Sequence, residues 1–316
     1  MHTPDLSLPE LFDHLNRHGL AQRLVELARD EDLGLNPDVG DVTSKAAILA
    51  TARGTATIAA REEGVVCGMV LLPMVLHAFK ADADAEPLVR DGDTVKAGQV
   101  VAKLSGNLRG LLAAERTMLN FVGRLSGVAT RTRAMVELVR GTPAKVFDTR
   151  KTTPGLRVLE KYAVRCGGGH CHRIGLFDAA LVKDNHLAGV APADLPAFLR
   201  RTLKRAEDAA DRDGLAFFEV EVDTLEQFDA ILKAGGCGVH IVLLDNMNAD
   251  QLREAVRMRK EAGGGAGVGM RMELEASGGI TRENLPEIAS TGVDRISLGT
   301  LTHGAKWLDF GVDFAA

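Results

Sequence analysis

Residues 217–245, FFEVEVDTLEQFDAILKAGGCGVHIVLLD, decide the fold of this chain. The apolar run Phe217–Val222 is followed by a helix-patterned stretch, Leu225–Ala234, and then by a second apolar run, Val239–Leu244. A strand, a helix and another strand in this order are typical of a βαβ unit, whose two strands lie parallel in one sheet. The stretch therefore predicts an α/β fold in which helices cover a parallel sheet.

The same alternation continues on both sides of this unit. Further apolar runs predict strands at Ala144–Phe147, Ala179–Val182, Met272–Ala276 and Arg295–Leu298. Helical patterns lie between most of the strands, at Gly155–Val164, Asp194–Ala210, Ala249–Ala262 and Arg282–Ser290. Either a barrel or a doubly wound sheet fits this order. No Gly-x-Gly-x-x-Gly fingerprint follows an early strand, which weakens the dinucleotide-binding alternative.

The sequence before residue 144 is patterned differently and predicts a mixed region. Its expected elements are a helical segment at Leu8–Arg29, a strand at Gly54–Arg61, a helix at Met69–Lys80, antiparallel β-structure at Val89–Gly106 and a helix at Leu108–Arg140. The turn signals Asp91-Gly92 and Ala97-Gly98 separate short apolar runs, which favours antiparallel pairing there.

Composition restricts the function classes. Of the 316 residues, 46% are apolar but only 4% aromatic, so the core must consist of Ala, Val, Leu and Ile. No run of about 18 apolar residues predicts a membrane span, and the first twenty residues lack the apolar core of a secretory signal. The net charge of −5, without Lys/Arg runs, argues against nucleic acid as a partner. The spacing of the four cysteines is typical of cytosolic thiols, so we expect a cytoplasmic protein.

Residues 148–186, DTRKTTPGLRVLEKYAVRCGGGHCHRIGLFDAALVKDNH, concentrate positive charge against this acidic background. The stretch holds seven Lys or Arg residues and only four Asp or Glu residues, with three histidines among them. Cations gathered around a glycine run favour a site for a strongly anionic small molecule. A solvated helix face would explain only Arg157, Lys161 and Arg165, which have helical spacing.

Polar residues follow nearly every predicted strand. In a βα-barrel the active site forms where the carboxyl ends of the strands meet, and phosphate often binds at the last loops. Ser277-Gly278-Gly279 and Gly299-Thr300 follow the last two strands, so we expect a phosphate cradle there rather than tight turns alone. The carboxylates of Glu221 and Asp245 could hold Mg²⁺ or sugar hydroxyls, although salt bridges are an alternative. Together these features suggest a phosphorylated sugar meeting an anionic acceptor.

Motifs along nearly the whole chain resemble the quinolinate phosphoribosyltransferase family. They are GDVT from Gly40, ERTMLN from Glu115, DTRKTTPGLR from Asp148, KYAVRCGGGHCHR from Lys161, LVKDNH from Leu181, EVEV from Glu219, LLDNM from Leu243, LEASGG from Leu274 and GVDRISLGTLTH from Gly292. The family couples quinolinate to phosphoribosyl pyrophosphate and releases pyrophosphate and CO₂. The product is nicotinate mononucleotide, on the route to NAD.

The resemblance implies an architecture. We expect an N-terminal α/β sandwich-like domain over residues 1–125 and an incomplete (β/α) barrel with parallel strands over residues 126–303. The tail, residues 304–316, is expected to pack back toward the first domain. The resemblance also implies a homodimer or higher homo-oligomer in which a neighbouring subunit helps close each site.

The resemblance also implies roles for individual residues. Arg150, His172, Arg173 and Lys183, with Thr149 beside them, would bind the two quinolinate carboxylates, and Arg116 would reach in from the neighbouring subunit. Lys151 would contact the pyrophosphate, and Glu221 and Asp245 the ribose hydroxyls and Mg²⁺. The phosphate pocket would be lined by Ser277, Gly278, Gly279, Gly299 and His303.

Three alternatives stay open. Cys171 stands where the family pattern leads us to expect Asn, and Cys166, His170, Cys171 and His172 form a C-x₃-H-C-H run. Zinc sites usually draw ligand pairs from separated segments, so substitution beside a substrate loop is the favoured interpretation. A relative acting on another acid, or a catalytically silent nucleotide sensor, would share the fold. Retention of Arg116, Arg150, Arg173 and Lys183 favours a dicarboxylate, and the presence of Lys151, Glu221 and Asp245 argues against a silent sensor.

Overall fold

The computed structural model describes residues 6–36, 39–210, 214–263 and 272–315, in two compact units. The barrel unit comprises Met135–Arg150 and His170–Gly299. The helix-sheet unit comprises Asp5–Ala134, Lys151–Gly169 and Thr300–Ala316.

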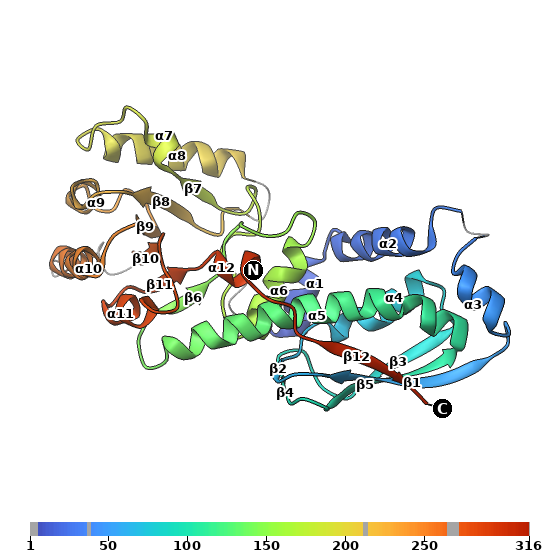
Figure 1. Ribbon diagram of the computed structural model, residues 1–316. Helices are drawn as coiled ribbons and strands as arrows, with labels where there is room; N and C mark the ends of the chain where they lie inside the picture. Colours follow the sequence, from blue (N-terminus) through green and yellow to red (C-terminus); the bar gives the residue numbers. More distant parts are fainter. Residues whose placement is uncertain (1–5, 37–38, 211–213, 264–271, 316) are drawn as a thin grey trace. The chain divides into compact units, whose positions relative to one another are not determined.

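The barrel unit contains a six-stranded parallel sheet with the order β6-β11-β10-β9-β8-β7. Its strands are β6 (Lys145–Phe147), β7 (Ala180–Val182), β8 (Phe218–Val222), β9 (Ile241–Asp245), β10 (Glu273–Ser277) and β11 (Arg295–Ser297). The helices of this unit are α7 (Asp184–Leu187), α8 (Leu195–Ala209), α9 (Leu225–Lys233), α10 (Ala249–Gly263) and α11 (Leu285–Ser290). Figure 1 shows α9, α10 and α11 along the outer side of the strands. Each predicted strand of the alternation is confirmed to within two residues at its ends.

The strand order is that of a barrel cut between β6 and β7, because these two strands occupy opposite edges of the sheet. Every residue of β8 is buried, as are four of the five in β9, which is the pattern of strands covered on both faces. At the open edge, Phe147 of β6 forms a parallel bridge with His170. The His170 segment therefore begins to fill the gap that a closing strand would occupy.

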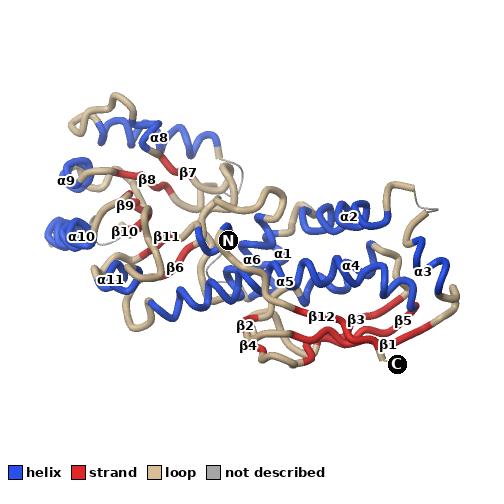
Figure 2. Tube along the Cα trace, in the orientation of Figure 1, coloured by secondary structure: helices blue, strands red, loops and turns tan. Residues whose placement is uncertain are grey.

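The helix-sheet unit contains an antiparallel sheet with the order β12-β1-β5-β3 and a small β2–β4 pair. Its strands are β1 (Arg53–Ala60), β2 (Gly64–Val65), β3 (Ala83–Pro87), β4 (Thr94–Val95), β5 (Val100–Asn107) and β12 (Phe310–Phe314). The expected β-structure at Val89–Gly106 is confirmed in β4 and β5, whereas β3 and β12 were not predicted. Strand β12 pairs with β1, so the end of the chain completes this sheet (Figure 2).

The helices of this unit are α1 (Leu8–Leu15), α2 (Leu20–Leu33), α3 (Val42–Ala47), α4 (Leu72–Ala78), α5 (Leu108–Leu138), α6 (Arg157–Cys166) and α12 (Thr300–His303). The last four residues of α5 belong to the barrel unit. The expected helical segment Leu8–Arg29 is two helices: α1 ends at Leu15, and Gly19, with a left-handed φ of 65°, is the N-cap of α2. The expected helix Met69–Lys80 begins as a 3₁₀ turn, Met69–Leu71, and Pro73 lies in the first turn of α4, where proline is tolerated.

Helix α5 continues through Gly123 and Gly127, although glycine disfavours the interior of a helix. Both glycines allow a close approach of the chain near its end. A Cβ at Gly127 would lie 1.9 Å from the Lys306 carbonyl oxygen, and the Leu308 N–H donates to the Gly123 carbonyl at 3.0 Å. These glycines therefore serve packing rather than flexibility.

The compact units do not follow the expected domain boundaries. The boundary predicted after residue 125 falls inside α5, and the division lies between Ala134 and Met135. Residues 151–169 group with the helix-sheet unit because α6 packs against α1 and α2. The glycine-rich run of residues 263–267 lies outside the described residues, apart from Gly263 at the end of α10.

Candidate functional site

The carboxyl ends of the parallel strands bring together most of the predicted site residues of the barrel unit. Lys183 follows β7, Glu221 lies near the end of β8, and Asp245 is the last residue of β9. The β9–β10 register places Ser277 opposite Asp245. Because parallel strands end at the same edge, these residues lie at one edge of the sheet, where the active site of a βα-barrel is expected.

Acidic groups are in excess at this edge. The Lys183 ammonium forms an ion pair with Glu221, whose side chain is 8% exposed. Asp245 accepts a hydrogen bond from the Asn246 amide at 2.6 Å. Burial raises the pKa of Asp245, and the neighbouring charge of Glu221 raises it further. Carboxylates that repel one another in this way fit a site for a divalent cation, because a cation would offset their charge.

The loop after β10 has a backbone that favours glycine. Gly278 and Gly279 have φ values of 84° and 62°, which L side chains rarely adopt. A Cβ at Gly278 would also lie 2.3 Å from the Asn246 amide oxygen, and the Asn246 N–H donates to the Ser277 carbonyl at 2.9 Å. The loops after β9 and β10 are therefore packed together, while Gly299 follows β11.

A second group of predicted residues lies along the open edge of the sheet. Asp148 follows β6 and is fully buried, and its carboxylate accepts a hydrogen bond from the backbone N–H of His172 at 2.8 Å. His172 and Arg173 are buried, whereas Arg150 is partly exposed. Burial lowers the pKa of Arg173, and the nearby charge of Arg150 acts in the same direction. Two guanidinium groups held this close favour an anionic ligand.

Three predicted site residues belong to the helix-sheet unit. Arg116 is exposed on α5, Lys151 is exposed after the segment Thr149–Arg150, and His303 is exposed in α12. The Lys151 carbonyl accepts the Thr302 hydroxyl at 2.6 Å, which holds the start of the 151–169 segment against α12. The predicted set is thus divided between the two units.

The cysteines do not form the cluster that the C-x₃-H-C-H run could suggest. Cys166 belongs to the helix-sheet unit, where its Sγ lies 3.6 Å from that of Cys67, whereas Cys171 belongs to the barrel unit. All four cysteines are buried thiols. Among the described residues, the group with the spacing of metal ligands contains no cysteine; it consists of His172, Glu219 and Glu275.

Sequence reasoning gave no role to a buried charged cluster in the barrel. Glu219, Glu275 and Arg295 are each less than 9% exposed. The acids were visible as charges at alternate positions of otherwise apolar strands, where inward-facing residues share one face. Arg295 was counted only as the start of a strand.

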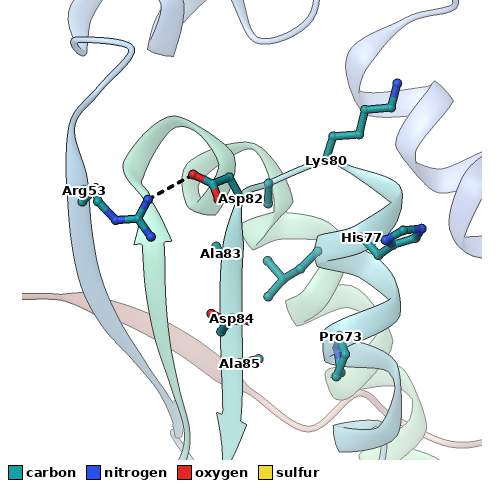
Figure 3. A pocket seen from close by; sticks show the side chains of 10 residues that line it. Arg53, Pro73, His77, Lys80, Asp82, Ala83, Asp84 and Ala85 are labelled. Carbon is teal, nitrogen blue, oxygen red and sulfur yellow. Dashed lines mark hydrogen bonds and ion pairs between the residues drawn. The ribbon is translucent and has the colours of Figure 1, made fainter.

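The helix-sheet unit has a pocket of its own, of about 510 Å³, between α4 and β3 (Figure 3). Arg53 forms a 3.0 Å ion pair with Asp82 at its rim, and His77 and Lys80 line it. None of the predicted site residues lines this pocket.

An open parallel barrel with cations beside one edge strand, and with acids and glycine loops at the strand ends, defines a class of α/β enzymes that act on phosphorylated substrates. Comparison with known proteins specifies the family. Residues 128–313 match "Quinolinate phosphoribosyl transferase, C-terminal domain", and residues 41–126 match its N-terminal domain. The chain belongs to the quinolinate phosphoribosyltransferase family.

Individual relatives agree with this family. A probable nicotinate-nucleotide pyrophosphorylase [carboxylating] from Bacillus subtilis is 38% identical over 283 residues, 90% of this chain and 89% of the relative. The nicotinate-nucleotide pyrophosphorylase [carboxylating] of Mycobacterium leprae is 42% identical over 275 residues, 86% of this chain and 90% of the relative. The solved nicotinate-nucleotide pyrophosphorylase of Francisella tularensis is similar with a TM-score of 0.80 and 35% identity, covering 94% of this chain and 96% of that one.

Among the described residues, no helix has both the length and the apolar character needed to cross a bilayer.

Proposed function

We propose that this chain transfers the phosphoribosyl group of phosphoribosyl pyrophosphate to quinolinate, with loss of CO₂, to form nicotinate mononucleotide and pyrophosphate. One observation carries the proposal beyond family membership: the paired guanidinium groups of Arg150 and Arg173 lie in the same unit as the strand-end group Lys183, Glu221 and Asp245. Two carboxylates on one acceptor require several cations, and arginine is suited to bind them.

The acceptor would bind to the cationic group. Arg150, Arg173 and Lys183, with His172 and Thr149 beside them, are the proposed quinolinate-binding residues. Lys183 is already held by Glu221, so its ammonium has a fixed place at the strand ends before substrate arrives. Fixing both substrates in this way converts a two-body reaction into a local one.

The phosphoribosyl donor would bind to the loops and acids. Ser277, Gly278, Gly279, Gly299 and His303 are the proposed phosphate-binding residues, since glycine N–H groups can approach a phosphate closely. Breaking the ribose–pyrophosphate bond develops positive charge on the sugar, which the carboxylates of Glu221 and Asp245 would stabilise. Lys151 would offset the charge on the departing pyrophosphate.

Magnesium is part of this proposal. The repulsion that raises the pKa of Asp245 beside Glu221 supports a cation at this place, and these two acids would hold Mg²⁺ directly or through water. When bound, Mg²⁺ would neutralise charge on the pyrophosphate.

Loss of CO₂ then follows from the chemistry of the ring. Once the ring nitrogen is bonded to the ribose it is positively charged. The electron pair left at C2 when the carboxylate departs as CO₂ is stabilised by that charge, and a proton then adds to C2.

We also propose that the protein acts as a homodimer or a higher homo-oligomer in the cytoplasm. Arg116 is exposed on α5, so its guanidinium is available to a site in a second copy. Four buried cysteines kept as thiols fit a reducing compartment.

The proposal is tested by offering quinolinate and nicotinate in parallel, each with phosphoribosyl pyrophosphate and Mg²⁺. We expect nicotinate mononucleotide from quinolinate alone. Arg150→Ala should raise the quinolinate KM and lower kcat/KM by about a hundredfold, as expected for a lost charge-assisted hydrogen bond. The matched control is Arg201→Ala, which removes an exposed arginine of α8 and should leave the kinetics unchanged. Turnover of nicotinate, or wild-type kinetics in Arg150→Ala, would overturn the assignment.

A further inference from the structure

The inner face of the parallel sheet carries three buried charged side chains that the proposed reaction does not use. They are Glu219 of β8, Glu275 of β10 and Arg295 of β11. The Arg295 Nε donates to the Glu275 carboxylate at 2.7 Å, and the Arg295 guanidinium lies 3.6 Å from the ring centre of Phe147. Charges removed from water are costly unless they are compensated, so a cluster of this kind calls for a reason beyond stability.

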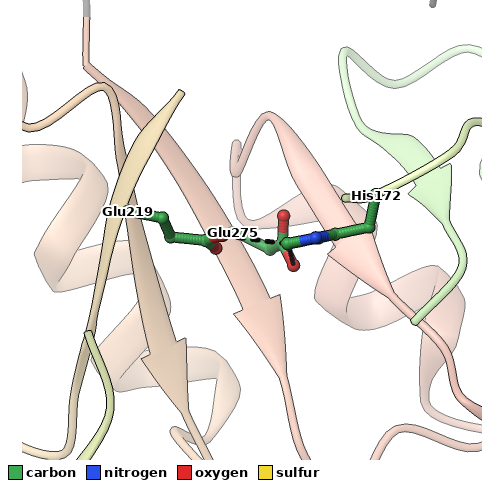
Figure 4. Close-up of side chains that lie close together, drawn as sticks. All are labelled: His172, Glu219 and Glu275. Atoms are coloured by element: carbon green, nitrogen blue, oxygen red, sulfur yellow. Dashed lines mark ion pairs between the residues drawn. The ribbon is translucent and has the colours of Figure 1, made fainter. Parts of the chain in front are cut away.

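The cluster is joined to the proposed quinolinate site through His172 (Figure 4). The His172 Nε2 lies 2.9 Å from a Glu219 oxygen and 3.5 Å from a Glu275 oxygen. Glu219 and Glu275 stand on strands separated by β9, and the curvature of the sheet brings both to one imidazole. The edge of this imidazole also packs on Phe217, with ring centres 5.3 Å apart.

The other ring nitrogen of His172 is engaged as well. The backbone N–H of Arg173 donates to the His172 Nδ1 at 2.7 Å. An accepting nitrogen carries a lone pair, so the ring proton belongs on Nε2, the nitrogen beside Glu219. Both nitrogens therefore have protein partners, and the ring is only 7% exposed. A buried imidazole arranged in this way can orient the chain that carries Arg173.

The segment fixed by His172 is the one that carries Arg173. Asp148 accepts the His172 N–H, Asp178 accepts the Ile174 N–H at 2.7 Å, and the Arg173 guanidinium donates to the Ala179 carbonyl at 3.3 Å. These contacts fix the backbone on either side of Arg173.

We propose that Glu219, supported by Glu275 and Arg295, is a positioning residue for the substrate-binding arginine. It acts through the His172 ring, which fixes the Arg173 backbone before an anion arrives. The inference rests on the proposed function, because Arg173 meets quinolinate only if that function is correct.

A bound divalent cation is the competing explanation for this cluster, since His172, Glu219 and Glu275 have ligand-like spacing. Arg295 already supplies a positive charge to Glu275, and the Arg173 N–H and Glu219 already engage the imidazole. The two acids therefore already have cationic or imidazole neighbours without a metal. Metal analysis of the purified protein separates the two explanations: a stoichiometric metal that is lost in Glu219→Gln would overturn the proposal.

The kinetic test uses Glu219→Gln, which keeps the shape of the side chain and removes its charge. We expect quinolinate affinity, measured by calorimetry, and kcat/KM for quinolinate to fall about ten- to hundredfold, as for a misplaced binding group. The KM for phosphoribosyl pyrophosphate should stay unchanged, which a general loss of structure would not allow. The matched control is Glu273→Gln, which removes the charge of an exposed acid that also contacts Arg295. It should behave as wild type.

A spectroscopic test on the unaltered protein covers the case in which Glu219→Gln does not fold. In ¹⁵N spectra of the histidine rings, the signals of His172 are those that are missing from the spectrum of the His172→Asn variant. We expect the ring proton on Nε2, the nitrogen beside Glu219, and no proton on Nδ1, which accepts the Arg173 N–H. A proton on Nδ1 would exclude that hydrogen bond and would overturn the proposal.

These outcomes are distinguishable from failure of the proposed function. If wild-type protein neither binds nor turns over quinolinate, the proposed function itself fails. If wild type is active and Glu219→Gln binds quinolinate equally well, the function stands and the positioning role is wrong.

Discussion

The two units of the molecule bury acidic side chains in different ways. In the helix-sheet unit, Glu160 is fully buried and accepts from the Arg124 guanidinium at 2.5 Å and from the Thr153 N–H at 3.0 Å. The same Arg124 also donates to the Thr302 carbonyl at 2.9 Å. In the barrel unit, Glu219 and Glu275 instead face His172 and Arg295, next to the residues proposed to bind quinolinate.

This difference indicates that the buried acids of the two units have different roles, one in stability and the other in ligand binding. Arg124 and Glu160 tie together α5, α6 and α12, so their removal should act on stability. The partners of Glu219 adjoin a ligand-binding segment, so its removal should act on binding. Mutations in the two units test this division.

The largest effect is expected for Arg116 and Lys183, which we propose meet in one site from different subunits. Arg116→Ala and Lys183→Ala should each nearly abolish activity, because each removes a cation proposed to bind the acceptor. Verified heterodimers of the two variants should recover up to about half of wild-type activity, since one of two sites regains both residues. Heterodimers as inactive as the parents would argue against a shared site.

The next effect concerns the stability of the helix-sheet unit. Glu160→Ala should lower the free energy of unfolding by about 3–5 kcal/mol, because the Arg124 charge would stay buried without its carboxylate. Glu137→Ala is the matched control: it breaks an exposed pair with Arg140 and should cost less than about 1 kcal/mol. Urea unfolding of both variants measures the contrast. Equal losses in the two would contradict the structural role of Glu160.

A smaller, pH-dependent effect is expected at Asp91, which accepts the Gly68 N–H at 2.8 Å and the Tyr162 hydroxyl at 2.9 Å. Burial raises the pKa of Asp91 above its ordinary value of 3.8, against the lowering effect of these hydrogen bonds. The folded protein then binds this proton more tightly than the unfolded chain. The stabilising contribution of Asp91 is therefore greatest below pH 3.8 and decreases as the pH rises through the raised pKa.

Urea unfolding of wild type and Asp91→Asn at pH 4 and pH 7 checks this sign. The difference in unfolding free energy should move in favour of the Asn variant at the higher pH, by less than the loss in Glu160→Ala. Asp93→Asn, at an exposed neighbouring position, is the control. A difference that moves the other way would show that Asp91 is favoured as the ion.

The smallest expected effect on stability is that of Asp245, an acid that we propose acts in the reaction. Because burial and Glu221 disfavour ionised Asp245, Asp245→Asn should raise the melting temperature slightly, by about 2 °C in the absence of Mg²⁺, while abolishing turnover. Calorimetry and the activity assay together measure this trade. A stable, active Asp245→Asn would remove Asp245 from the proposed mechanism.

The sequence allowed the barrel to be predicted because its strands are short apolar runs followed by polar residues. Edge strands escaped prediction: β3, Ala83–Pro87, reads ADAEP, and its acids and proline are not typical of a strand. The strand-end residues Lys183, Glu221 and Asp245 could be predicted because active-site residues of a βα-barrel lie at the carboxyl ends of its strands. Those positions can be seen in the sequence.

The cluster beneath the site could not be found in the same way. Whether Glu219 is buried depends on partners from other strands and from the His172 loop, and pairing of this kind leaves no local pattern. The same holds for Gly127, because a Cβ at this position would clash with the Lys306 carbonyl oxygen. Contacts between distant segments, rather than local propensity, decide both positions.

The most direct test of the central claim follows the carboxylate that the reaction should remove. Quinolinate labelled in its C2 carboxyl group is incubated with the protein, phosphoribosyl pyrophosphate and Mg²⁺, and labelled CO₂ and pyrophosphate are counted together. The account predicts one labelled CO₂ for each pyrophosphate and each nicotinate mononucleotide. Pyrophosphate released without labelled CO₂, or no product at all, would contradict it.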